Sequence, residues 1–328
     1  MIKNIVNETS TLIDVCICTY NPNAENLRHV FQALVDQSLE KSLWKVIVID
    51  NNSSVPLQKE ILALLERSGI NCTLVNEPAP GIINARRRAI AEVTAPWILF
   101  VDDDNILSKD YLEKGYNYAI NHDYVGCFGG RLKLTPELRP ADWLMPLLPL
   151  LAIKDYGDSE IVSWSEAWGP WMPPSAGLFI RNEVASRFIK QINGNLAYDS
   201  LGRRGRQLNS GLDYMMVRVA PQTGLACAYV SELELYHDLE PSRLTLGYMS
   251  RINWAYGRSH AIIRNIERNA GADSRARKQS LILYICGIPL RIFKECAESP
   301  KYAFCRIAYR LGFIWQKAVT FFAVRLPI

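Results

Sequence analysis

Three consecutive aspartates, Asp102, Asp103 and Asp104, follow an apolar run at residues 97–101. Adjacent carboxylates repel one another, so a nearby cation stabilises them. Carboxylate oxygens suit Mg²⁺ or Mn²⁺, which proteins usually hold through one or two carboxylates together with substrate phosphates. The triplet therefore predicts a divalent-metal site. The alternative is a solvated acidic turn ahead of a helix, where aspartate is favoured.

Apolar runs alternate with amphipathic segments in the first hundred residues. The runs occupy residues 12–19, 44–50, 72–76 and 97–101. The helices predicted between them cover residues 27–34, 57–65 and 82–93. Strands that are apolar on both faces and joined by helices are typical of a parallel α/β sheet.

Polar residues stand where these apolar runs end: Thr19, Asp50, Asn76 and Asp102. The carboxyl ends of parallel strands meet at one edge of a sheet, and ligands of such sheets bind there. We therefore expect these residues to line one site. The first run ends in CTYNPN and not in a G-x-G-x-x-G turn, which disfavours a dinucleotide dehydrogenase.

The regular alternation ends near residue 130, where a tryptophan- and proline-rich stretch begins. The elements expected beyond it are a strand at 176–181, a helix at 182–189, short strands at 226–230 and 233–237, and helices from Pro241 onward. Such a long irregular stretch is usually functional. Its residues Trp164, Trp168 and Trp171 either contact a substrate or cover the core.

Charge and composition narrow the class of protein. With 49% apolar and 21% charged residues, the 328-residue chain is globular. Residues 275–328 carry ten Lys or Arg against Glu295 and Glu298, a charge of +8, which leaves −4 for the rest of the +4 chain. A basic, apolar tail on an acidic body indicates contact with an anionic membrane surface and not with nucleic acid.

Cysteine usage and the N-terminus indicate a cytoplasmic protein. The eight cysteines are scattered, form no Cys-x-x-Cys pair and lie mostly in apolar runs, so we expect reduced core residues. The first 14 residues contain no apolar stretch typical of a secretory signal. We expect a cytoplasmic location, with peripheral attachment to the inner face of the plasma membrane.

Several motifs, taken in chain order, resemble glycosyltransferase family 2. They are CTYNPN, HVFQALVDQSL, VIVIDNNSS, NEPAPGIINARRRAI, ILFVDDDN, GLFIR, GLDYMM and ELELYHDLEPSRLT, and they cover residues 12–260. The resemblance implies the GT-A fold, an α/β Rossmann-like doubly wound mixed sheet, here with a C-terminal helical, amphipathic extension. It implies a nucleotide-sugar-binding half at 1–130, an acceptor-binding half at 131–240 and an extension at 241–328.

The resemblance also implies roles for individual residues. Those expected to bind the nucleotide-sugar donor are Thr19, Tyr20, Asp50, Asn51, Arg86, Asp102 and Asp103. Those expected to hold Mn²⁺ or Mg²⁺ are Asp104, Asp102 and His237, with a purely structural histidine as the alternative. Asp213 corresponds to the catalytic base, although Leu212 stands where relatives carry Glu. The alternative for Asp213 is an acid that favours a helix N-terminus.

The implied activity is inverting, metal-dependent glycosyl transfer, a hexosyltransferase-like reaction of class EC 2.4. The donor is a nucleotide-diphosphate sugar, with UDP favoured and GDP and dTDP open. The acceptor is a hydroxyl of a polysaccharide or lipid-linked oligosaccharide, which points to cell-envelope polysaccharide biosynthesis. The alternatives are a lipid-phosphate or protein acceptor, and an inactive nucleotide-sugar-binding scaffold.

An amphipathic helix is expected at 299–325, where Arg306, Arg310 and Lys317 share one face. Lys317 interrupts the most apolar window, so the helix fits a membrane surface better than a membrane span. The alternative is that this helix and LILYICGIPL at 281–290 pack on the catalytic domain or on a second copy of the chain.

Overall fold

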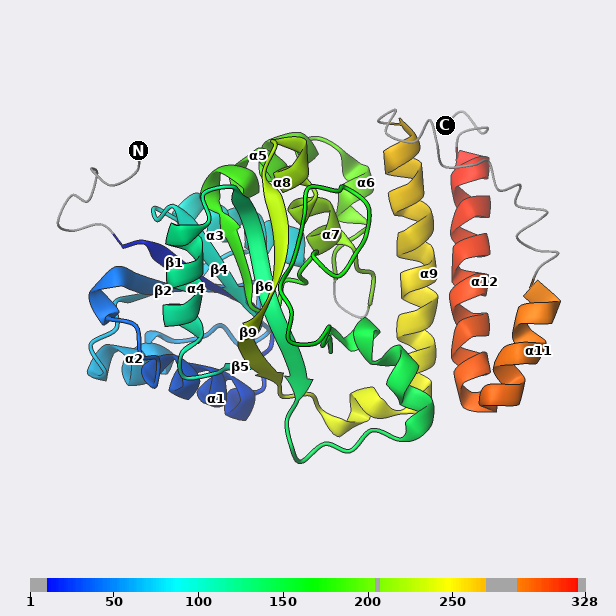
Figure 1. Cartoon of the computed structure of the whole chain (residues 1–328), viewed down its shortest axis with the longest axis horizontal. Helices are drawn as coiled ribbons and strands as arrows, with labels where there is room; N and C mark the ends of the chain where they lie inside the picture. Colours follow the sequence, from blue (N-terminus) through cyan, green and yellow to red (C-terminus); the bar gives the residue numbers. More distant parts are fainter. Residues whose placement is uncertain (1–10, 204–206, 270–287, 324–328) are drawn as a thin grey trace. The chain divides into compact units, whose positions relative to one another are not determined.

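A mixed sheet with helices on its connections occupies most of the chain (Figure 1). The computed structural model describes residues 11–203, 207–269 and 288–323. The strands are β1 Ile13–Thr19, β2 Trp44–Asp50, β3 Cys72–Asn76, β4 Trp97–Val101, β5 Asn105–Leu107, β6 Val125–Leu134, β7 Ile161–Ser163, β8 Leu178–Arg181 and β9 Ala226–His237. The α-helices are α1 Ala24–Val35, α2 Ala63–Arg67, α3 Ile82–Glu92, α4 Tyr111–Asn121, α5 Asn182–Ile192, α6 Leu196–Asp199, α7 Leu212–Val217, α8 Val219–Gln222, α9 Leu246–Asn269, α11 Ile288–Glu298 and α12 Pro300–Ala323. Short 3₁₀ segments cover Lys41–Leu43, Lys59–Leu62, Asp142–Leu151 and Pro241–Leu244.

The sheet has the order β3-β2-β1-β4-β8-β6-β9-β5, with β7 paired to β9. Strands β1 to β4 are parallel, as their apolar runs predict. Strand β8 is antiparallel to both β4 and β6, which makes the sheet mixed. The predicted α/β class with a GT-A type sheet is therefore confirmed.

Helix α1 shows how the sequence sets one of the connections. Asn23 caps it, because its side-chain oxygen accepts hydrogen bonds from the backbone N–H groups of Glu25 and Asn26. The apolar residues of the helix are spaced three or four apart, and Leu27 and Leu34 are fully buried. This spacing packs one face of the helix on the sheet and leaves the other in solvent.

One prediction about the sheet is wrong: residues 226–237 form a single strand, β9, and not two. The polar pair Ser231 and Glu232 interrupts the apolar pattern, but the strand continues through a register shift opposite Gly130. A Cβ on Gly130 would lie 2.0 Å from the carbonyl oxygen of Leu233. Glycine is therefore what allows β6 and β9 to approach closely at the bulge.

The predicted helix at 57–65 also differs in part. It begins as a 3₁₀ turn at Lys59–Leu62 and becomes α-helical only from Ala63. The backbone N–H of Leu57 donates to the carboxylate of Asp50, 2.8 Å away. This hydrogen bond holds the start of the segment to the end of β2, and the α-helix begins only after it.

The described residues form two compact units. The first comprises the described residues up to Thr135 with Ala152–Asn193 and Asp213–Leu239, and it contains the sheet. The second comprises Pro136–Leu151, Gly194–Leu212 and the described residues from Glu240 onward. Strand β6 crosses residue 130, where the two predicted halves meet. Both halves, 1–130 and 131–240, therefore contribute strands to the same sheet.

In the second unit, helices α9 and α12 run side by side (Figure 1). Two glycines allow the close approach. A Cβ on Gly257 would lie 2.0 Å from the carbonyl oxygen of Tyr309, and one on Gly312 would lie 2.2 Å from that of Trp254. Helix α11 packs against α12 as well.

The basic residues of α12 that were predicted to share one face have partners within the helical unit. Arg310 is buried and donates two hydrogen bonds, of 2.6 and 2.7 Å, to the carboxylate of Glu295 in α11. Lys317 lies over the ring of Phe313. The cations of the predicted basic face therefore have partners within the unit, and contact of this helix with a membrane stays a prediction.

The outward face of α12 is apolar instead. Phe304, Leu311, Trp315 and Val319 are exposed and follow one another at helical spacing. In the described part of the chain, no helix combines the length and the apolarity needed to cross a bilayer. The segment 281–290 lies outside the described residues except for its last three.

Candidate active site

The parallel strands bring four polar strand ends to one edge of the sheet, as predicted. In the register of the sheet, Thr19 lies opposite Asp50, and Asp50 lies opposite Asn76. Ile17 pairs with Val101, so Thr19 is level with the residue two beyond it, Asp103. The Thr19 hydroxyl donates a hydrogen bond to the Asp103 carboxylate. The side chains at the ends of two neighbouring strands, β1 and β4, therefore meet at this edge.

Asn105 shapes the turn that holds the three aspartates. Its side-chain oxygen accepts from the backbone N–H of Asp102, and its own N–H donates to the Asp102 carbonyl. Its amide also donates to Asp104 Oδ1 at 3.2 Å. Asn105 is fully buried and was not among the predicted site residues, although asparagine is typical of such turns.

Asp104 and His237 form the best candidate for a metal-binding pair. His237 Nε2 lies 3.1 Å from Asp104 Oδ1, and both residues are buried. Strand β5 pairs with β9 so that Asn105 lies opposite His237, which brings the neighbouring Asp104 to this imidazole. Among the described residues, no group of three or more His, Cys, Asp or Glu side chains surrounds one point. One carboxylate and one imidazole are donors that suit a divalent ion whose other ligands are substrate oxygens.

Asp102, also predicted as a metal or donor ligand, is partly buried beside this pair. Burial raises the pKa of its carboxyl, and the charge of Asp104 raises it further, while Arg86 and His237 act in the opposite direction. The cluster is therefore short of positive charge. A bound cation would lower the free energy of the ionised triplet.

Asp213, the predicted catalytic base, lies at the start of α7 and is bonded to Arg86 of α3. The backbone N–H of Ser175 donates to its other carboxylate oxygen at 3.3 Å. Burial by itself raises the pKa of Asp213, but the charge and hydrogen bond of Arg86, with the bond from Ser175, hold it below its usual value. The carboxylate is therefore ionised at neutral pH.

Arg86 was predicted to lie near the nucleotide, and the structure shows that it is also the partner of Asp213. Its guanidinium is buried, pairs with Asp213 and lies 5.7 Å from the ring centre of Phe100. Burial lowers its pKa, but the charges of Asp213 and Asp102 raise it more. Arg86 thus joins the predicted base to the aspartate triplet through one permanent positive charge.

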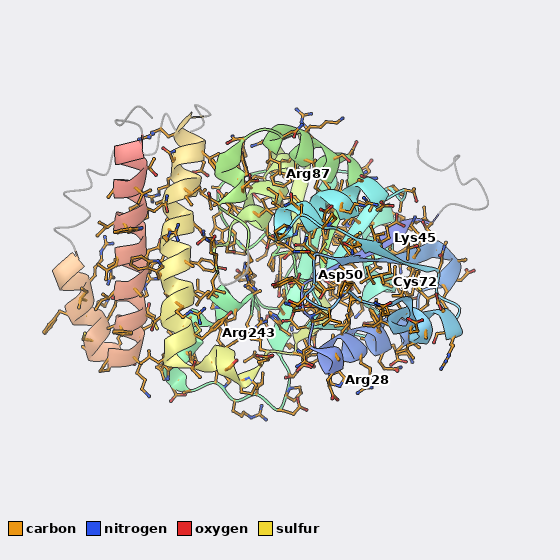
Figure 2. The ribbon with its side chains drawn as sticks, turned by 180° about the vertical axis from the view of Figure 1, so that it is seen from behind. Arg28, Lys45, Asp50, Cys72, Arg87 and Arg243 are labelled. Atoms are coloured by element: carbon orange, nitrogen blue, oxygen red, sulfur yellow. The ribbon has the colours of Figure 1, made fainter. Side chains whose placement is uncertain are left out.

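Two predicted donor ligands hold loops at the same edge. Asp50 lies inside the first unit, at the opposite end of β2 from Lys45 (Figure 2). Its carboxylate accepts from the backbone N–H groups of Ser53 and Leu57. Its contact with a base or ribose stays a prediction.

Asn51 bridges the loop after β2 to the loop before α3. Its amide donates to the carbonyl groups of Glu77 and Ala79, and its oxygen accepts from the N–H of Gly81. Asn51 therefore positions these two loops relative to each other. Tyr20 is half exposed at the same edge of the sheet. Donor contacts of both residues stay predictions.

The tryptophan-rich loop is tied to the helix that carries Asp213. Glu166 accepts hydrogen bonds from Arg218 and Gln222, at 3.1 and 3.0 Å, and its carbonyl accepts from the Tyr214 hydroxyl. Of the three tryptophans singled out, Trp164 and Trp168 are more than half exposed. They do not simply cover the core.

Comparisons with known proteins agree with these features. Residues 14–162 match the sequence profile of the family described as Glycosyl transferase family 2. Glycosyltransferase AglE of Haloferax volcanii is 31% identical over 130 residues, 39% of this chain and 42% of that protein. Succinoglycan biosynthesis protein ExoW of Rhizobium meliloti is 26% identical over 113 residues, 34% of this chain and 35% of that protein. The matched stretch thus spans less than half the length of either relative.

A solved structure shares the fold. The crystal structure of S. aureus TarS residues 1–349 superposes with a TM-score of 0.50 and 13% sequence identity, covering 95% of this chain and 91% of that chain. At this identity the likeness concerns the fold alone. Residues 14–162 are thus similar to glycosyltransferase family 2, and the described structure shares its fold with TarS.

Proposed function

We propose that the protein transfers a sugar from a nucleotide-diphosphate donor to an acceptor hydroxyl, with inversion at the anomeric carbon. The observation that carries the proposal is the pairing of Asp213 with Arg86 beside the Asp102–Asp104 triplet. An acid kept ionised and a cluster suited to a metal–diphosphate complex are the two groups that this reaction needs. The match of residues 14–162 to the profile of glycosyltransferase family 2 supports the same activity.

Asp213 is the group that takes the proton of the attacking hydroxyl. It is ionised at neutral pH, so it is able to accept a proton as the hydroxyl oxygen attacks the anomeric carbon from the face opposite the diphosphate. Arg86 and the N–H of Ser175 fix both carboxylate oxygens in position. Positioned general bases typically contribute a factor of about 10²–10⁴ in rate.

Asp104 and His237 would hold the divalent ion, with Asp102 close by. When bound, Mn²⁺ or Mg²⁺ supplies Lewis-acid stabilisation of the departing diphosphate. One carboxylate and one imidazole leave room for phosphate oxygens, which suits a metal that arrives with the donor. Thr19 orients Asp103 beside them for a contact with the donor ribose or with metal-bound water.

For the substrates, we propose a UDP-sugar donor and a glycan acceptor. ExoW is a succinoglycan biosynthesis protein, which supports a polysaccharide acceptor, while AglE supports glycosyl transfer without naming an acceptor. Acceptors with a lipid phosphate or a protein side chain are the alternatives that an acceptor screen would reveal.

We also propose peripheral contact with the anionic inner face of the plasma membrane. The exposed apolar residues of α12, among them Leu311 and Trp315, form one outward face, and the basic residues Arg291, Lys294 and Lys301 of the same helical unit are exposed. An apolar helix face accompanied by cations fits the boundary of an anionic bilayer. A lipid-linked acceptor is confined to that plane.

The first experiment measures thermal stability with UDP, GDP and dTDP, each with and without Mn²⁺. A ligand at a hundredfold excess over its dissociation constant stabilises the folded state by about 2.7 kcal/mol. We expect a metal-dependent increase with UDP. No increase with any nucleotide would overturn the proposed donor site.

The second experiment measures transfer and donor hydrolysis by wild type and Asp213→Asn. We expect transfer to fall by a factor of about 10²–10⁴ while nucleotide binding is unchanged. Glu183→Gln, at the start of α5, is the control for an acid in a helix first turn. Full transfer by the Asp213 variant would remove the base assignment. Nucleotide binding without donor turnover in the wild type would favour the scaffold.

A further inference from the structure

A buried lysine that the mechanism above does not use lies in the sheet-containing unit. Lys154 is 8% exposed and is held by two backbone hydrogen bonds with Leu132, of 2.9 and 3.0 Å. Its ammonium nitrogen lies 4.5 Å from the ring centre of Trp168. No ion pair recorded for the described residues includes Lys154.

The aromatic ring beside this ammonium belongs to a structured corner next to Asp213. Trp168 is 58% exposed and meets the ring of Tyr214 edge to face, 5.4 Å between centres. Tyr214 follows Asp213 in α7, and Glu166 ties the tryptophan loop to Arg218, the residue directly after that helix. An exposed aromatic face, an ionised acid and a buried ammonium therefore lie together.

We infer that Lys154 and Trp168 form a subsite for an acceptor sugar that carries a negatively charged group, a phosphate or a carboxylate. The inference rests on the proposed transferase function. A buried ammonium is costly without a charged partner, and a cation–π contact supplies only part of what is lost. A neutral acceptor would need the aromatic ring alone, whereas an anionic one would also satisfy the lysine.

The protonation state of Lys154 agrees with this role. Burial lowers its pKa to about 8, and the negative charge of Asp213 acts in the opposite direction. The lysine is therefore mostly protonated at neutral pH, and the charge of a bound anion would raise its pKa. The group is thus charged when an anion arrives.

The test measures binding of glucose, glucuronate and glucose 6-phosphate to the full-length protein saturated with UDP and Mn²⁺, by ligand-observed NMR or calorimetry. We expect the two anionic sugars to bind about tenfold more tightly than glucose, because a hydrogen bond to a charged group is worth about a factor of ten or more. Lys154→Met should abolish this preference, and Lys154→Arg should retain much of it. Lys133→Met, which removes a lysine paired with Glu234, is the matched control and should change nothing.

Three results would overturn the inference, and each differs from failure of the proposed function. Equal binding of charged and neutral sugars by the wild type would leave Lys154 a structural cation held by Trp168. Loss of UDP affinity in Lys154→Met, with sugar preference unchanged, would assign the lysine to the donor diphosphate. Loss of the anionic preference in Lys133→Met as well would show an effect of overall charge. Absence of nucleotide binding in the wild type would instead refute the transferase proposal itself.

Discussion

At the scale of single residues, the paired charges of Asp213 and Arg86 determine how this site responds to pH. The two side chains come from α7 and α3, 127 positions apart in sequence. Arg86 lowers the pKa of Asp213, and the charge of Asp213 raises the pKa of Arg86, so each favours the charged form of the other. The proposed base and its neighbour are therefore a unit, and substitution of either one alters both.

Arg86→Met should shift the acid limb of the rate–pH profile to higher pH. In the wild type, Arg86 holds the pKa of Asp213 below its usual value, so activity is lost only as pH falls through that low pKa. Without the guanidinium, burial still raises the pKa of Asp213, so protonation and loss of activity occur at a higher pH. Rate–pH profiles of both proteins at saturating donor measure the shift.

Arg87→Met is the matched control for that substitution. Arg87 is the next residue of α3, and its guanidinium donates to Asn84 instead of to a carboxylate. Its profile should superpose on that of the wild type. An unchanged acid limb in Arg86→Met would show that another group determines the pH dependence.

At the scale of elements, glycines determine how closely two helices approach. Gly312 of α12 faces the backbone of α9 at Trp254, and Gly257 of α9 faces the backbone of α12 at Tyr309. Backbone contact of this kind leaves no room for a side chain. The pairing of α9 with α12 therefore depends on two positions that carry no side chain at all.

Gly312→Ala should destabilise the helical unit by about 1–3 kcal/mol, because the new methyl group would force the helices apart. Hydrogen exchange of α9 and α12 amides, with urea denaturation, measures the effect. Gly247→Ala is the control, since no atom lies within 4 Å of its added Cβ and alanine favours a helix. Equal stability of the Gly312 variant and the wild type would contradict the packing described here.

At the scale of the whole molecule, charge and apolar surface are unevenly divided along the chain. The part before residue 275 has a net charge of −4, and the part from there onward +8. Arg310 is buried against Glu295 and Lys317 is half-buried over Phe313, so the fully exposed positive charge comes from other residues such as Lys301. The outward face of α12 is left to apolar side chains.

Replacement of Leu311 and Trp315 together by serine should reduce binding to phosphatidylserine-containing vesicles by about tenfold or more, because each buried apolar side chain contributes about 1.5–3 kcal/mol. Co-sedimentation with anionic and neutral vesicles measures it. Ile120→Ser, an exposed apolar position of α4, is the control. Unchanged vesicle binding would refute the membrane proposal. A change in oligomeric state instead would identify a second copy as the partner of this face.

The amino-acid sequence by itself determined the parallel part of the sheet. Buried strands such as 44–50 and 97–101 read as uninterrupted apolar runs, and polar residues at their ends, such as Thr19 and Asp102, mark the ligand edge. These signals are local, because side-chain polarity and spacing decide burial within one element. The order of the motifs indicated the resemblance to glycosyltransferase family 2.

The tertiary structure alone decided which side chains meet. The Arg86–Asp213 pair and the contact of Lys154 with Trp168 join separate segments of the chain, and no local sequence pattern predicts them. Likewise, the basic spacing in α12 identified a helix face, but only packing against α11 turned Arg310 toward Glu295. Periodicity tells which residues share a face, whereas the partner that the face meets depends on the folded chain.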